Sequence, residues 1–201
     1  MNKTLLFLCT LTAAIAISAP NADAAGRIHA RGGVQNAEGG ITAGRASAAR
    51  GRNGGAAARG RAIKTDGQGN GQAASGGAYR APNGGTGARA GGTTWNADGS
   101  AQHQSGAQWS GANSAGSTQG TATRNADGTV SGHRTTNATG AQGGSYRADT
   151  AYVDGSLDRS VDATGRSGNS YTADVTGTKG EGVTRTATCH DPNGAVIPCK
   201  P

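Results

Sequence analysis

The sequence predicts two unlike parts: a largely disordered N-terminal half and a C-terminal all-β region of antiparallel hairpin repeats, forming a meander or an irregular solenoid. Three observations support this. Glycine accounts for 37 of 201 residues and aromatic residues for 3%. Basic residues are concentrated in the N-terminal half, and Asn-Ala-Asp-Gly turn sequences recur further on. Because few large apolar side chains are available for burial, and ordering each residue costs roughly 1–2 kcal/mol, we expect order only through local strand pairing.

The first 24 residues have the pattern of a cleaved secretory signal. Lys3 precedes an apolar run at residues 5–17, and small residues lead up to a cleavage site between Ala24 and Ala25. The apolar run is shorter than the ~20 residues that a membrane-spanning helix needs. We therefore expect an exported protein without a membrane span in its mature chain, located in the periplasm, outside the cell or on the cell surface.

Residues 25–92 are predicted to be a disordered, basic segment rich in Gly, Ala and Arg. Residues 25–90 contain ten basic and two acidic residues, and glycine interrupts every apolar run. Clustered guanidinium groups bind polyanions by releasing counterions, whereas the alternative is a solvated linker kept soluble by its charge. The candidate polyanion-binding residues are Arg27, Arg31, Arg45, Arg50, Arg52, Arg59, Arg61 and Lys64. No aromatic residue lies between Ala25 and Ala78, which predicts binding without base stacking.

Residues 93–201 are predicted to form β-hairpin repeats. Residues 138–149 and 163–174 share the pattern ATGxxGxSYxAD, and NADG occurs at 96–99 and 125–128. Asn or Asp can bond the backbone two residues on, and Gly accepts a positive φ, which predicts type I turns followed by a one-residue bulge.

The sequences that flank these turns alternate as strands should. Tyr146 and Ala148 would lie on one face, with Arg147 and Asp149 on the other. Thr-rich, repetitive strands with exposed edges also favour self-association.

The tail CHDPNGAVIPC contains Cys189 and Cys199, the two cysteines that remain once cleavage removes Cys9. A metal site would need more ligands than these thiolates and His190, and a catalytic cysteine would need an oriented base. An even number of cysteines in an oxidising compartment predicts a disulfide. The bridge would close a hairpin turned at residues 191–194.

The common catalytic and phosphate-binding motifs are missing from the sequence, which predicts a protein that is not an enzyme and uses no cofactor. The acidic residues near turns are Asp98, Asp127, Asp154 and Asp191. Each turn carries few acids, so we interpret them as turn-forming residues rather than as calcium ligands. Trp95 and Trp109 are interpreted as packing residues, with a sugar-stacking platform as the alternative.

With its signal sequence, its NADG repeats and its cysteine-closed tail TRTATCHDPNGAVIPC, the chain resembles the glycine-rich, repeat-containing exported proteins of Gram-negative bacteria. The resemblance implies an envelope-associated or extracellular protein and brings no catalytic residues with it.

Charge and repeats together predict a non-enzymatic, secreted or periplasmic structural or interaction protein. Its basic segment would bind lipopolysaccharide, acidic polysaccharide or extracellular DNA, and its β-repeats would self-associate. The alternative is a small secreted binding module or effector that acts through the C-terminal β-region.

Overall fold

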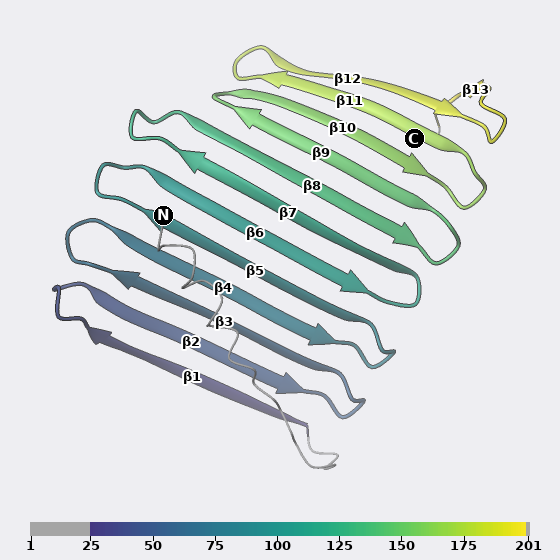
Figure 1. The fold of residues 1–201 in the computed structure, drawn as a ribbon. Coiled ribbons are helices and arrows are strands. Elements are labelled where there is room, and N and C mark those ends of the chain that lie inside the picture. Colours follow the sequence, from purple (N-terminus) through teal and green to yellow (C-terminus); the bar gives the residue numbers. More distant parts are fainter. Residues whose placement is uncertain (1–24, 200–201) are drawn as a thin grey trace, which may run out of the picture.

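The computed structural model describes residues 25–199, which form one antiparallel sheet of thirteen strands in sequence order (Figure 1). The strands are β1 (Gly26–Gln35), β2 (Ile41–Arg50), β3 (Ala56–Thr65), β4 (Gly71–Arg80), β5 (Thr86–Trp95), β6 (Ala101–Ser110), β7 (Ser114–Arg124), β8 (Val130–Gly140), β9 (Ser145–Val153), β10 (Ser156–Thr164), β11 (Ser170–Thr178), β12 (Gly182–His190) and β13 (Val196–Ile197). No helix occurs within 25–199, so none there is long and apolar enough to cross a membrane. The predicted signal, with Cys9 and Ala24, lies outside the described residues.

The predicted all-β C-terminal region is confirmed, and its arrangement is a meander. The prediction that 25–92 is disordered is wrong. Strands β1 to β5 cover most of that range, and β5 runs across the expected boundary at residues 92 and 93 without a break. The basic and the repetitive parts of the chain therefore belong to one continuous sheet.

Regular turn spacing explains how residues 25–92 form strands although they contain few large apolar side chains. Asn36, Gly51, Asp66, Ala81 and Asn96 open successive turns fifteen residues apart, each turn being followed by a strand of ten residues. Because residues 25–199 place no second layer on either face of the sheet, the strands need no alternation of apolar and polar residues. Their register is set by the turns instead.

Most of the turns have the predicted conformation of a type I turn followed by a bulge, whereas the two-residue turn at Asp154 and Gly155 has positive φ at both positions. At the first turn the Gly39 N–H donates to the Asn36 carbonyl (3.1 Å) and the Asn36 N–H donates to the Gly40 carbonyl (2.9 Å). Gly39 has φ +81°, a value that glycine adopts at little cost. The same pair of bonds occurs at Asn96 and at Asp191, which confirms the turn predicted at residues 191–194.

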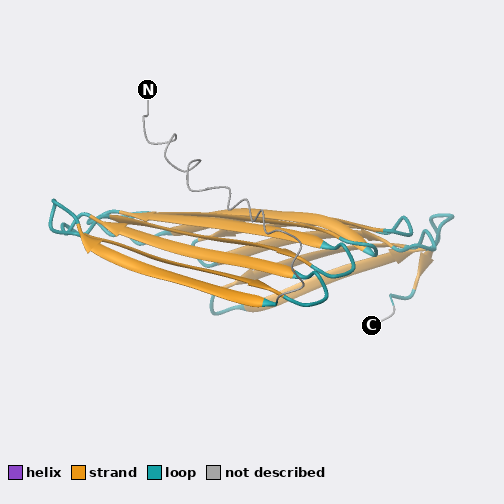
Figure 2. Ribbon diagram, turned by 90° about the horizontal axis from the view of Figure 1, so that it is seen from below, coloured by secondary structure: helices purple, strands orange, loops and turns teal. Residues whose placement is uncertain are grey.

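The sheet is a single layer with very little core (Figure 2). Between residues 25 and 199 the buried apolar side chains are Ala148, 3% exposed, and Ala173, 5% exposed. Ala148 lies between the side chains of Tyr146 and Arg159 on the same face of β9 and β10. The Arg159 guanidinium donates a hydrogen bond of 2.8 Å to the Tyr146 hydroxyl, so this pair helps to cover Ala148 in the absence of a second layer among the described residues.

Large aromatic side chains lie over glycines of the neighbouring strands. A Cβ atom at Gly87 would collide with the Tyr79 ring, and one at Gly116 would collide with the Trp109 ring. The rings thus cover backbone that glycine leaves bare, which is a known device for stabilising glycine in strands.

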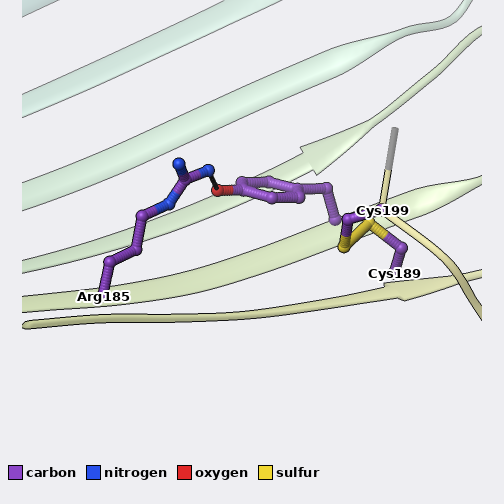
Figure 3. Close-up of a disulfide and its surroundings, with 4 residues drawn as sticks. Arg185, Cys189 and Cys199 are labelled. Atoms are coloured by element: carbon purple, nitrogen blue, oxygen red, sulfur yellow. Dashed lines mark hydrogen bonds between the residues drawn. A yellow bond between two sulfur atoms is a disulfide. The ribbon is translucent and has the colours of Figure 1, made fainter. Parts of the chain in front are cut away.

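The end of the sheet is closed by a disulfide between Cys189 and Cys199, with Cα atoms 5.3 Å apart, as predicted (Figure 3). Strand β13 forms two residue pairs with β12, Cys189 with Ile197 and His190 with Val196. Close by, Arg185 donates a hydrogen bond to the Tyr171 hydroxyl, and the two bracket the buried Ala173.

Reducing the disulfide is expected to free β13 and leave the rest of the sheet folded. A bridge over so short a loop contributes about 2–3 kcal/mol locally, while β1 to β11 make no contact with β13 that it could disturb. Hydrogen exchange should show the Val196 and Ile197 amides losing protection after reduction. Loss of protection across β5 to β8 would contradict this prediction.

Candidate functional site

The pairing register divides the strand residues between two faces of the sheet. Residues directly opposite each other share a face, and neighbours along a strand alternate. One face, which we call the arginine face, carries Arg27, Arg31, Arg45, Arg59, Arg61, Arg89, Arg124, Arg134, Arg159 and Arg185. No strand described in the structure places an Asp or Glu on that face. The strands therefore carry a strongly cationic surface with no counter-charge of its own.

The other face, which we call the mixed face, carries both signs of charge. Its charged strand residues are Arg50, Lys64, Arg80, Arg147, Asp149, Asp158, Asp162 and Asp174. The ion pairs of the described residues lie here, joining Asp149 to Arg147 at 2.8 Å and to His133 at 3.9 Å. The predicted alternation of Tyr146 and Ala148 against Arg147 and Asp149 is confirmed.

Three arginines on the arginine face oppose one another directly. Arg31 stands opposite Arg45, which in turn stands opposite Arg61, and all three are exposed. Opposed residues in an antiparallel sheet have Cβ atoms about 4.5–5.5 Å apart, where like charges are destabilising. The described residues give these three guanidinium groups no acidic partner. The row therefore weakens the sheet unless an anion from outside neutralises it.

The arginines toward the C-terminus on the same face are engaged within the sheet. Arg159 and Arg185 donate to tyrosine hydroxyls, and the Arg185 guanidinium also lies 5.8 Å from the centre of the Tyr171 ring. Arg134 donates to the hydroxyls of Thr118 and Ser105, at 3.2 and 3.1 Å. Arg59 of β3 is held in the same way, because its Nε donates to the Ser47 hydroxyl at 3.3 Å. Arginine is nevertheless densest on β1 to β5, which carry six of the ten strand arginines of this face.

A shallow groove of about 680 Å³ crosses β1 to β6 on the arginine face. The lining residues come mainly from two neighbouring rows that run across the strands. One row contributes Arg27, Tyr79 and Trp109, and the other contributes His29, Arg59 and Arg89. Apart from Gln108, the remaining lining residues are small (Ala, Gly and Ser47), so the groove has a floor made mainly of Ala and Gly.

The candidate polyanion-binding residues are thus divided by the fold. Arg27, Arg31, Arg45, Arg59 and Arg61 share the arginine face, whereas Arg50 and Lys64 lie on the mixed face and Arg52 lies in a turn. The sequence interpretation missed Arg89 and Tyr79, which belong to the groove, and it considered Trp109 only as a packing residue or as part of a platform with Trp95. The fifteen-residue turn spacing was the signal that could have placed them.

The two tryptophans do not form a joint platform. Both lie on the arginine face, but at opposite ends of the strands. Trp109 stands opposite Gly87 of β5, whereas Trp95 is eight residues further along β5 and stands opposite Ala101. Each ring covers a glycine, Gly71 or Gly116, in agreement with the packing interpretation.

The acidic turn residues act on their own turns. The pKa of Asp127 is lowered because its carboxylate accepts bonds from the Thr129 hydroxyl (2.7 Å) and N–H (2.9 Å). Asp98 has its pKa lowered in the same way by Ser100. Within residues 25–199 no three His, Cys, Asp or Glu side chains gather in a group that could hold a metal ion.

Acid is expected to weaken the sheet partly through Asp149. Its pKa is lowered from 3.8 by hydrogen bonds from Thr135 (2.7 Å) and Arg147 (2.8 Å). A depressed folded-state pKa means stability that is present above pH 3.8 and lost as the pH falls through the folded value. Urea midpoints should therefore separate Asp149→Asn from the wild type at pH 6 and bring the two together near pH 2. Asp174→Asn, in the same cross-strand row, serves as the control, and an unchanging gap would contradict the prediction.

The chain matches no protein-family model, no curated protein and no solved structure, so its site is interpreted from its own geometry.

Proposed function

We propose that the protein is a non-enzymatic, secreted or periplasmic interaction protein that binds anionic polymers of the cell envelope or extracellular matrix through its arginine face. The sheet acts as a rigid support that holds guanidinium groups in fixed rows. The ligand-binding region is the part of that face formed by β1 to β5.

One observation carries this proposal: ten strand arginines share a face on which the described strands place no carboxylate. A chain that used arginine only for solubility would gain nothing from sorting it to one side. The direct opposition of Arg31, Arg45 and Arg61 adds an electrostatic cost that a bound polyanion removes. Neutralisation of several charges with counterion release is the usual source of affinity for polyanions.

Self-association is a further part of the proposal, because β1 forms an open edge. In the described chain β1 pairs with β2 alone, and all ten of its residues are exposed. Long exposed edges pair readily with other strands. Sedimentation velocity at increasing protein concentration tests this, and a monomer at all concentrations, with and without polyanion, would contradict it.

The binding proposal is tested with the exported protein and heparin at salt concentrations from 50 to 500 mM. We expect the logarithm of the affinity to fall linearly with the logarithm of salt concentration, with a slope of about 3–5 set by the number of contacts. Affinity that does not change with salt, or the absence of binding at low salt, would contradict it. Cell fractionation tests the proposed location separately.

A further inference from the structure

The groove on the arginine face has a regular internal spacing. Tyr79 of β4 and Trp109 of β6 lie two strands apart in one row, with Gly87 of β5 between them. Arg59 of β3 and Arg89 of β5 lie two strands apart in the neighbouring row, with Gly77 between them. Strands are about 4.7–4.9 Å apart, so rings and cations each repeat at about 9.5 Å.

This spacing is a consequence of the hairpin repeat. One hairpin with its turns contributes two strands, so residues at equivalent places in successive hairpins reappear every second strand of the sheet. In the pairing register the aromatic and the arginine positions are offset from each other by one strand, so these positions alternate along the groove. The rings themselves reach over the next strand, onto Gly87 and Gly116. A polymer that fits must also alternate flat apolar surfaces with negative charges along an extended chain.

Both rings pack against glycines of the next strand, with Tyr79 exposed and Trp109 half-buried. Trp109 covers Gly116 with one side of its indole, because a Cβ at that glycine would meet the ring. Tyr79 covers Gly87 in the same way and remains 51% exposed. The described chain forms a single layer, so no second layer covers the other side of either ring. Ring surfaces that no second layer covers are suited to stacking against a ligand.

We infer that the ligand of this groove is an acidic polysaccharide built of carboxylated sugar rings, lying across the strands from β1 to β6. The inference rests on the proposed function and names its ligand class. The apolar C–H faces of the sugars would stack on Tyr79 and Trp109, and the carboxylates would accept hydrogen bonds from Arg59 and Arg89. The ring spacing corresponds to one disaccharide of an extended chain.

A nucleic acid fits the groove less well. Bases along one strand stack at about 3.4 Å per nucleotide, and single-strand binders present aromatic side chains on which successive bases stack. Here Gly87 separates the two aromatic positions, and the floor of the groove is lined by small side chains. The groove crosses six strands, a length of about 24 Å, which accommodates several linked sugars.

The test compares three polyanions at 50 mM salt: polygalacturonate, polyglutamate and single-stranded DNA. Polyglutamate carries carboxylates without sugar rings and is therefore the matched control. We expect the exported protein to bind polygalacturonate about tenfold more tightly than polyglutamate, the order of magnitude of one stacking contact. Trp109→Leu should lower this preference by weakening the binding of polygalacturonate more than that of polyglutamate.

The control variant is Trp95→Leu, because Trp95 also covers a glycine on the same face but lies outside the groove. It should keep the preference for polygalacturonate. In a Trp95→Phe background, acrylamide quenching of Trp109 fluorescence should fall when polygalacturonate binds. Because this measurement keeps Trp109 in place, it tests the inference even if Trp109→Leu lowers stability.

The outcomes separate the inference from the proposed function. Equal affinities for polygalacturonate and polyglutamate, tighter binding of DNA, or the same loss of preference in Trp95→Leu would overturn the polysaccharide inference and leave polyanion binding intact. Failure to bind any of the three polymers would overturn both.

Discussion

Replacing Arg31, Arg45 and Arg61 together by glutamine is expected to weaken polyanion binding by about tenfold to a hundredfold at low salt, and at the same time to stabilise the sheet. Binding weakens because three guanidinium groups leave the arginine face, each lost contact lowering the salt slope by about one. Stability rises because the three side chains stand directly opposite one another. Removing such like-charge pairs contributes a few tenths to about 1 kcal/mol each.

Weaker binding together with higher stability distinguishes a binding role of these arginines from a structural one. An arginine that served only the fold would reduce stability when replaced, whereas an arginine retained for binding reduces affinity and relieves repulsion. Heparin titration by calorimetry measures the first effect and urea unfolding the second. A triple variant that is less stable and binds equally well would show that the row is structural.

The matched control replaces Arg50, Lys64 and Arg80 by glutamine on the mixed face. Both triple variants remove three charges from a net charge of +7, so they have equal overall charge. We expect the control to lose only the small part of the affinity that depends on long-range attraction. Equal losses in the two variants would mean that net charge alone drives binding, and the arginine face would lose its special role.

The second large effect concerns stability: Gly116→Val is expected to destabilise the sheet by about 2–3 kcal/mol. A Cβ at this position would meet the Trp109 ring and would lie 2.6 Å from the Asn137 carbonyl oxygen. The ring would have to leave its place, and the strand would have to shift away from β8. Urea unfolding followed by tryptophan fluorescence measures the loss.

Gly106→Val in the neighbouring strand is the control with the opposite expected sign. A Cβ at Gly106 has the Thr118 carbonyl oxygen at 3.4 Å as its nearest neighbour, which is ordinary contact. Valine there should be neutral or stabilise the sheet by up to about 1 kcal/mol, because it restricts the unfolded chain and suits a strand. If both substitutions destabilise equally, glycine is needed in these strands for reasons other than the aromatic cover.

Sequence reasoning predicted the C-terminal strands because local signals there agree. The NADG and DPNG turns have a defined conformation, and the tyrosine at 146 alternates with charged residues as a half-covered strand should. The disulfide followed from the number of cysteines that remain after cleavage at the predicted signal site. The turn and strand signals lie within a few residues of the features that they predict, whereas the disulfide required the cysteine count of the whole chain.

The N-terminal strands could not be recognised in this way. Their side chains on both faces are mostly small, so no periodicity of two emerges from the sequence. Composition alone indicated disorder, because the usual route to order is a buried core. A fifteen-residue turn period, from Asn36 to Asn96, is the signal that indicates strands without requiring a core.

The candidate site depends on register, which no single segment contains. Arg31 and Arg45 are fourteen positions apart in sequence and become direct neighbours only when the turn at Asn36 pairs β1 with β2. Trp109 joins Arg59 in the groove through three further strand pairings. Sequence reasoning therefore named most of the cations but could not say which of them face the same side.

Hydrogen exchange of residues 25–201 without ligand tests whether the basic N-terminal residues form a stable sheet on their own. We expect amides in β2 to β5 to exchange at least about a hundredfold more slowly than in a disordered chain, at protein concentrations where the protein is monomeric. Exchange at the rate of a disordered chain across residues 41–95, with protection only after a polyanion is added, would contradict it.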